Sequence, residues 1–148
     1  MIEQIKELLA SQQNLNEKKG IFLSAFDRNN ALLTSNGVLV TNKALTEVAE
    51  TLYKWLIASY KEVKYIVGDI IEQIEIKTSM EDIMQTDMTI YGICASTLDH
   101  TKSGVVLPNT LWISTASDAL GYIKQKNNLS GNITVYAFTT KRFHVHSV

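Results

Sequence analysis

Residues 20–60 read GIFLSAFDRNNALLTSNGVLVTNKALTEVAETLYKWLIASY. Within them, apolar residues recur at every second position of 21–26, and residues 27–30 favour a turn. This pattern predicts a β-hairpin with one buried face. A helical stripe with spacings of three and four follows, made of Leu45, Val48, Ala49, Leu52, Trp55, Leu56 and Tyr60. We expect the helix to cover the hairpin and form a core with it.

Two short signals lie between the hairpin and the helix. Asn36 and Gly37 form a dipeptide that favours a turn. Thr41 or Asn42 can accept a hydrogen bond from the first turn of a helix, so either is expected to cap the helix that follows.

The remaining sequence predicts shorter elements. Residues 2–12 form an amphipathic helix, and a surface linker of residues 12–19 follows it. Gly68 and Asp69 break one strand before a half-exposed strand at residues 74–78. Ser79 and Thr115 each precede an aspartate by three residues, which predicts two capped helices. Strands are expected at residues 88–95, 104–107 and 132–140.

These elements predict an α+β fold, with a mainly antiparallel sheet flanked by about three helices. A chain of 148 residues with 45% hydrophobic residues suits one domain over residues 1–148. Its expected parts are an N-terminal helix and linker at 1–19, a core at 20–140 and a solvated tail at 141–148.

The overall charge disfavours several classes of partner. Basic and acidic residues number 14 and 15, without a long basic run, so we expect neither nucleic acid nor membrane as a partner. A single cysteine and the lack of a signal-peptide pattern indicate a cytoplasmic protein. Glycine-rich nucleotide motifs are missing from the sequence, and no cofactor is expected.

Few residues carry obvious chemistry. His144 and His146 share one face of an extended segment, a spacing that suits a metal, but we interpret them as part of the solvated tail and expect no metal site. Cys94 lies in an apolar strand and is expected to be a packed thiol. His100 could pair with Cys94 or Ser103, although the composition of a surface loop also explains these residues.

Three blocks of sequence, in order, resemble the AMMECR domain family, the system protein A of the AmmeMemoRadiSam set. GIFLSAF at 20–26 is similar to the family's opening Gly-Val-Phe-Val-Thr-Leu strand. IIEQIEI at 70–76 is similar to its Leu-Glu-Ile-Glu-Val strand, and SGVVLPN at 103–109 to its Gly-Leu-Leu-Leu-Pro-Gln segment. The resemblance covers nearly the whole chain and implies association with Memo-like or radical-SAM proteins.

The chain departs from the family at its most distinctive motif, Leu-Arg-Gly-Cys-Ile-Gly. That motif falls on residues 32–37, where Leu33 replaces the arginine and Ser35 the cysteine. A serine hydroxyl is a poorer nucleophile and metal ligand than a thiolate, and leucine carries no charge. We therefore expect a diverged or minimal member, for which a role as an accessory protein that acts through a protein partner is favoured over catalysis.

Two alternatives remain open. In the first, the chain binds a small ligand or acts as an enzyme with a rebuilt site, whose candidate residues are Ser35, Asn36, Gly37, Gly104, Pro108 and Asn109. In the second, it is a profilin-like sensor or scaffold domain. Neither the catalytic residues nor the oligomeric state follows from the sequence.

Overall fold

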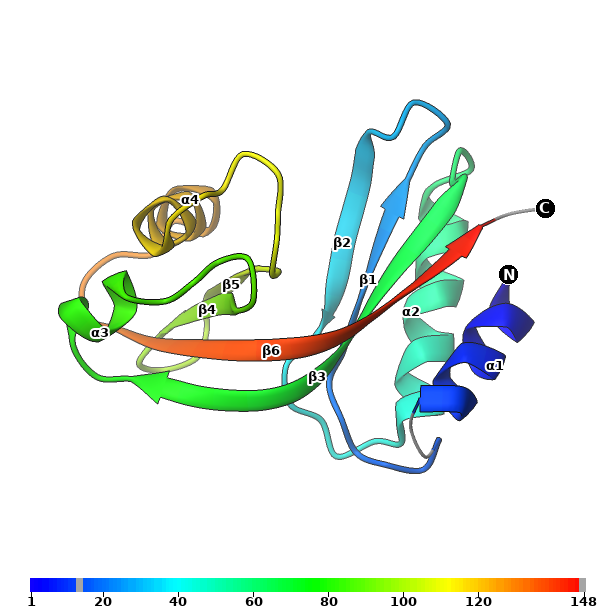
Figure 1. The fold of residues 1–148 in the computed structure, drawn as a ribbon, viewed down its shortest axis with the longest axis horizontal. Coiled ribbons are helices and arrows are strands. Elements are labelled where there is room, and N and C mark those ends of the chain that lie inside the picture. Colours follow the sequence, from blue (N-terminus) through cyan, green and yellow to red (C-terminus); the bar gives the residue numbers. More distant parts are fainter. Residues whose placement is uncertain (13–14, 147–148) are drawn as a thin grey trace. The chain divides into compact units, whose positions relative to one another are not determined.

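The structure is a computed structural model that describes residues 1–12 and 15–146, with the side chain of residue 12 left out. Its described part contains four helices and a six-stranded sheet with the strand order β2-β1-β3-β6-β4-β5 (Figure 1). The strand pairs β1 with β2, β1 with β3, β4 with β5 and β4 with β6 are antiparallel. This confirms the predicted α+β class with a mainly antiparallel sheet.

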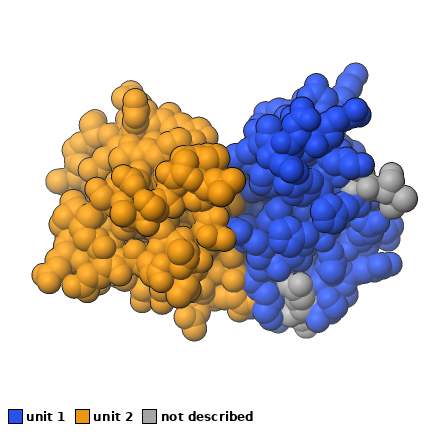
Figure 2. All heavy atoms as spheres, turned by 45° about the horizontal axis from the view of Figure 1, so that its top comes forward, with its two compact units in different colours: residues 1–71, 141–148 blue, residues 72–140 orange. Residues whose placement is uncertain are grey.

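The chain divides into two compact units, which Figure 2 colours separately. Unit 1 comprises residues 1–71 and 141–148, and unit 2 comprises residues 72–140. Strands β3 (Tyr65–Lys77) and β6 (Ile133–His146) contribute residues to both units. Each unit has its own cluster of buried apolar side chains.

In unit 1, helices α1 (Ile2–Gln12) and α2 (Leu45–Ser59) pack on each other, and α2 packs on β1 (Ile21–Phe26). β1 pairs with β2 (Leu32–Val38) as the predicted hairpin. The core holds side chains from both helices, from β1 and β3, and from the end of β6. The expectation that the long helix covers the hairpin is therefore correct.

The start of α2 differs from the prediction. Its N-cap is Ala44, not Thr41 or Asn42, and no side chain caps it. The N–H groups of Leu45 and Thr46 instead donate to the carbonyls of Glu17, at 2.8 Å, and Leu15, at 3.2 Å. Backbone oxygens of the linker thus satisfy the donors that a side-chain cap would have taken.

Trp55 was expected in the apolar stripe of α2, but 43% of its surface is exposed. The buried part of the stripe is narrower and consists of Leu45, Val48, Ala49 and Leu56. Trp55 lies beside the ring of Tyr60, with the ring centroids 6.2 Å apart. The second tryptophan, Trp112, is 67% exposed.

The predicted turn at Asn36 and Gly37 is wrong, because both residues lie inside β2. Gly37 pairs with Phe22, and a Cβ atom on Gly37 would lie 2.2 Å from the carbonyl oxygen of Ile21. The glycine therefore permits a close approach between two strands and does not make a turn.

The predicted break at Gly68 and Asp69 is also wrong, because β3 runs through both residues. A Cβ atom on Gly68 would lie 2.1 Å from the ring of Phe143, so the glycine makes room for that ring. In the later part of β3, Ile74 and Ile76 are 41% and 55% exposed. Their alternation therefore does not mark a buried face.

The segment at 141–148, including His144 and His146, was expected to be a solvated tail, and that expectation is wrong for residues 141–146. β6 continues to His146, and the side chains of Phe143 and Val145 are 3% and 2% exposed. They alternate with exposed histidines because a strand presents successive side chains to opposite faces. Residues 147 and 148 lie outside the described part.

Unit 2 contains α3 (Met80–Met84), β4 (Gly92–Thr97), β5 (Ser103–Val106) and α4 (Ala116–Asn127). The predicted caps are present: Ser79 Oγ and Thr115 Oγ1 each accept the N–H of the aspartate three residues later, both at 3.1 Å. β4 begins four residues later than expected. α4 packs on β4 and β5 and closes the core of this unit.

Candidate functional site

The six residues predicted to line a site fall in both units. Unit 1 holds the three that lie in β2, and unit 2 holds one in β5 and two that follow it. In chain order they are Ser35, Asn36, Gly37, Gly104, Pro108 and Asn109. The role of the six in a ligand site stays a prediction.

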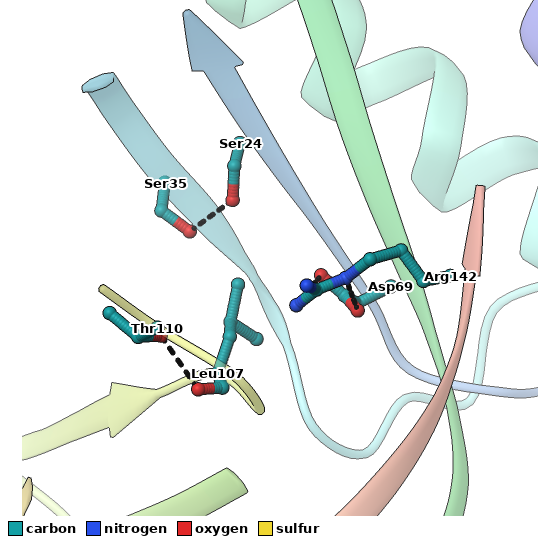
Figure 3. A network of polar contacts seen from close by, with 6 residues as sticks. All are labelled: Ser24, Ser35, Asp69, Leu107, Thr110 and Arg142. Carbon is teal, nitrogen blue, oxygen red and sulfur yellow. Dashed lines mark hydrogen bonds and ion pairs between the residues drawn. The ribbon is translucent and has the colours of Figure 1, made fainter. Parts of the chain in front are cut away.

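Ser35 faces Ser24 across the β1–β2 pair, and their hydroxyl oxygens are 3.0 Å apart (Figure 3). Ser24 is 5% exposed, whereas Ser35 is exposed. Two hydroxyls carry two protons, and the bond between them uses only one. The pair can therefore donate a further hydrogen bond to an acceptor that reaches Ser35.

The neighbours of Ser35 have local roles. Asn36 is exposed, and its side-chain oxygen accepts the N–H of Gly37 at 2.9 Å. Gly37 provides space for Phe22, as described above. Of the three predicted residues in β2, Ser35 is thus the one whose side chain forms a hydrogen bond with a neighbouring strand.

Asp69 and Arg142 lie on the same face of the unit 1 sheet as Ser24, and the sequence suggested neither of them. Asp69 faces Phe22 and Val67 faces Ser24. Ser24 and Asp69 are therefore diagonal neighbours on one face, a relationship that separates Cα atoms by about 7–8 Å. Asp69 is fully buried and accepts two hydrogen bonds from Arg142.

Arg142 binds Asp69 through two nitrogens. Nε lies 2.9 Å from Oδ1 and Nη2 lies 3.3 Å from Oδ2 (Figure 3). A guanidinium that meets a carboxylate at two points has a fixed orientation. The Arg142 side chain is 31% exposed, so solvent reaches it. We call the set Ser24, Ser35, Asp69 and Arg142 the Ser–Arg face.

Sequence reasoning missed Asp69 and Arg142 for identifiable reasons. Asp69 was assigned to a strand break and Arg142 to a tail. Two signals could have found them: a single acidic residue in the apolar run YIVGDII, and the alternation of Arg142 with Phe143 and Val145. A carboxylate in a buried strand needs a cationic partner.

In unit 2, Gly104 allows α4 to lie close to β5. A Cβ atom on Gly104 would be 2.1 Å from the amide nitrogen of Asn127, which donates to the carbonyl of Ile123 at 3.0 Å. This close packing accounts for a glycine at position 104, and no ligand is needed to explain it.

Pro108 and Asn109 form a turn after β5. Pro108 is buried, and Asn109 has a φ of 55°, in the left-handed region that asparagine tolerates. The Asn109 N–H donates to the carbonyl of Met88 at 2.7 Å, and Thr110 Oγ1 donates to the carbonyl of Leu107 at 2.7 Å (Figure 3). These bonds hold the loop that leads to Leu111 and Trp112.

His100 pairs with Ser96, a partner not among those expected. Its Nδ1 lies 3.3 Å from Ser96 Oγ, and Ser96 is 6% exposed. A substrate would reach such a hydroxyl poorly. Cys94 is 8% exposed, and burial raises the pKa of its thiol to about 11. This agrees with the expected packed thiol, because the thiolate is the reactive form.

Unit 2 also has a pocket of about 480 Å³. Its lining consists of Thr97, Leu98, Asp99, Thr101, Lys102, Asn128, Ser130 and Asn132. The hydroxyl of Thr97, followed by the N–H and hydroxyl of Thr101, lowers the pKa of Asp99 to about 2. Asp99 is therefore a carboxylate throughout the physiological range.

Residues 1–12 and 15–146, the part of the chain that the structure describes, hold neither a metal-ligand cluster nor a membrane-spanning helix. No group of three or more histidine, cysteine or acidic side chains is arranged to hold a metal ion there. In the same residues, each helix is too short or too polar to span a bilayer.

Comparison with known proteins informs the fold. No protein-family model matches the chain, and no curated protein sequence matches it. The structure is similar to the crystal structure of the uncharacterized protein PH0010 from Pyrococcus horikoshii, with a TM-score of 0.74 and 18% sequence identity. The match covers 97% of this chain and 86% of that protein. At this identity, the similarity concerns the fold alone.

Proposed function

We propose that the chain is an accessory protein of the AMMECR type that acts through a protein partner, either a Memo-like or a radical-SAM protein. The order of the three sequence blocks supports this proposal. So does the replacement of the family's arginine and cysteine by Leu33 and Ser35, which removes the motif residues with obvious chemistry. We also propose a cytoplasmic location, which the single cysteine supports.

The exposed apolar loop before α4 is the observation that carries the partner proposal. Leu111 and Trp112 are adjacent, and they are 80% and 67% exposed. Trp112 also has a φ of 64°, which is costly for a bulky side chain. Exposed tryptophan is typical of residues that dominate protein–protein binding, and backbone strain concentrates at functional positions.

A binding experiment tests this proposal. The tagged 148-residue chain is mixed with purified Memo-like and radical-SAM proteins from the same source, and the captured protein is quantified. We expect capture of one of them, and Trp112→Ala to weaken it at least tenfold, as for a residue that dominates an interface. Leu98→Ala is the matched control, because Leu98 is 62% exposed in a different loop. Capture of neither protein, or equal capture by Trp112→Ala, would refute the proposal.

A second candidate function is small-ligand binding at the Ser–Arg face. The observation in its favour is the combination of a fully buried carboxylate, a guanidinium that solvent reaches and an exposed serine on one sheet face. Ligand sites contain a small number of precisely placed polar side chains that fix the orientation of the ligand. A screen of small polar compounds by NMR of the labelled chain tests this. Chemical-shift changes that avoid β1, β2 and β6 would contradict it.

A further inference from the structure

We propose that residues 73–77, in the part of β3 that belongs to unit 2, bind an extended basic segment of another protein by strand addition. In this mode of binding, a peptide adds one strand to the open edge of a sheet. The proposal goes beyond the partner proposal above. It concerns a surface other than the loop of Leu111 and Trp112, and it defines the chemistry of the segment that binds there.

Residues 73–77 form an open edge of the sheet. β1 pairs with residues 65–70 of β3, and this pairing ends where Ile21 faces Ile70. β3 continues to Lys77, and in the described part of the chain the strand order places only β6 beside this continuation. Residues 73–76 are all exposed, so no described segment covers them. An edge strand directs a row of backbone N–H and C=O groups away from its sheet, and a further strand can pair with them.

The edge of β3 lacks the features that usually protect an edge strand, such as a short length, a proline or an exposed lysine. The opposite edge of unit 2 is β5, which has only the four residues Ser103–Val106 and is followed closely by Pro108. The edge of β3 contains no proline, and the side chain of Lys77 is only 13% exposed. Its Nζ lies 3.1 Å from Glu75 Oε1 and 3.6 Å from Asp82 Oδ1. The positive charge of Lys77 is therefore neutralised within the chain and does not guard the edge.

The side chains along this edge define the pattern of the strand that fits it. Ile74 and Ile76 share one face of β3 and are 41% and 55% exposed. Glu75 lies on the opposite face, and its side chain is 54% exposed. Side chains that face each other across two paired strands interact. A fitting strand therefore carries apolar side chains beside the two isoleucines and polar side chains beside Glu75.

Charge complementarity makes those polar side chains basic. Residues 73–82 contain three acidic residues, Glu75, Glu81 and Asp82, and one basic residue, Lys77. An added strand with lysine or arginine at alternate positions is attracted by this excess of negative charge. A second copy of the chain would bring the same acidic residues to the edge, and like charges that face each other are destabilising. The occupant is therefore a basic amphipathic segment and not the edge of a second copy.

Binding of synthetic peptides to the ¹⁵N-labelled 148-residue chain tests the proposal by NMR, at pH 7 and low ionic strength. The first probe is a short capped peptide of alternating valine and lysine. The second is the same peptide with every backbone nitrogen methylated, which keeps the charge but cannot donate hydrogen bonds to a strand. The third has glutamate in place of lysine. We expect the first peptide to shift the amide signals of residues 74–76 in a saturable way, and to bind at least about tenfold more tightly than the other two.

Two variants locate the site. Ile76→Lys replaces an exposed apolar side chain of the edge with a positive charge, and should weaken binding of the first peptide at least about tenfold. Ile90→Lys is the matched control, because Ile90 is 56% exposed and lies in the turn before β4. It makes the same change of side chain and of net charge, and should alter the affinity less than about twofold. Both positions are exposed, so both variants are expected to fold, and circular dichroism verifies this.

Several outcomes would overturn the proposal. Equal binding of the methylated peptide would show that the backbone of the added strand is not used, and equal binding of the glutamate peptide would exclude a basic segment. An equal loss of affinity in the two lysine variants, or no response of residues 74–76, would exclude this edge as the site. A dimer of the unaltered chain in sedimentation that Ile76→Lys abolishes would make a second copy the occupant. Trp112→Ala should bind the first peptide as the unaltered chain does, so failure here is distinct from failure of the partner proposal.

Discussion

Asp69 and Arg142 are 73 positions apart in the sequence and form a two-point ion pair, with Nε 2.9 Å from Oδ1 and Nη2 3.3 Å from Oδ2. The carboxylate is fully buried, and the guanidinium is its cationic partner. Burial of the Asp69 carboxylate costs desolvation energy, which its attraction to Arg142 offsets only while both groups are present. The ion pair therefore stabilises the contact between β3 and β6, and loss of either residue removes this stabilisation.

Arg142→Ala leaves the Asp69 carboxylate buried without this partner. We expect the free energy of unfolding to fall by about 3–5 kcal/mol. Urea denaturation followed by circular dichroism measures the change. Arg28→Ala is the control, because Arg28 is exposed in a turn and should change stability by less than about 0.5 kcal/mol. The double variant Asp69→Leu/Arg142→Met should lose less than the single one, and an equal loss would contradict the desolvation argument.

Gly68→Ala places a methyl group against the ring of Phe143, where the Cβ atom would lie 2.1 Å from a ring carbon. Overpacking of this kind should cost about 1–3 kcal/mol in stability. Gly121 in α4 has no neighbouring atom within 4 Å of such a Cβ. Gly121→Ala should therefore stabilise the protein by up to about 1 kcal/mol, through helix propensity alone. Thermal unfolding compares the two variants, and a loss of stability in both would contradict this reasoning.

The thiol of Cys94 should react slowly in the native protein. Burial raises its pKa from 9.0 to about 11, so at pH 8 only about one thiol in a thousand is ionised. Labelling by a chromogenic disulfide reagent should be much slower in buffer than in concentrated urea. As pH rises from about 9 to 11, the unfolded thiol loses its proton while the folded one keeps it, so stability should fall. Cys94→Ala should lack this component, and rapid native labelling would argue against burial.

Asp99 should titrate well below the ordinary pKa of an aspartate. Bonds from Thr97 and Thr101 lower its pKa from 3.8 to about 2, so its contribution to stability is present above pH 3.8 and is lost as pH falls toward 2. Thr97→Val removes the first of these donors, and the Asp99 pKa should rise toward 3.8. Carbon-detected NMR of the carboxyl group follows the titration. Thr51→Val, in α2, is the control, and an unchanged Asp99 pKa in Thr97→Val would show that the bond has little effect.

Much of the fold could be predicted where a signal is local. The caps at Ser79 and Thr115 need only a residue three positions away, and both are present. The hairpin and the helices α1, α2 and α4 could be predicted from the apolar periodicity within one segment of sequence, and the structure contains all of them. Cys94 was expected to be buried because its strand is uniformly apolar, and it is.

The errors concern residues whose role depends on a distant partner. Gly37 was interpreted as a turn because the packing of Phe22 beside it could not be foreseen. Gly68 and Asp69 were interpreted as a break because Phe143 and Arg142 lie more than seventy positions away. The cap of α2 was misassigned because the carbonyls of Leu15 and Glu17 replace it. Ser35 was a candidate site residue because it falls on the motif of the family that the sequence resembles. Ser24, whose hydroxyl forms a hydrogen bond with it, was not a candidate.

The division of the chain has a consequence for synthesis on the ribosome. Unit 2 is one continuous segment, whereas unit 1 needs residues 141–146 to supply Phe143 and Val145 to its core and Arg142 to Asp69. Unit 1 cannot complete its core until residues 141–146 have left the exit tunnel, whereas every residue of unit 2 is synthesised before that segment. Until then, the first 71 residues expose an incomplete core to chaperones.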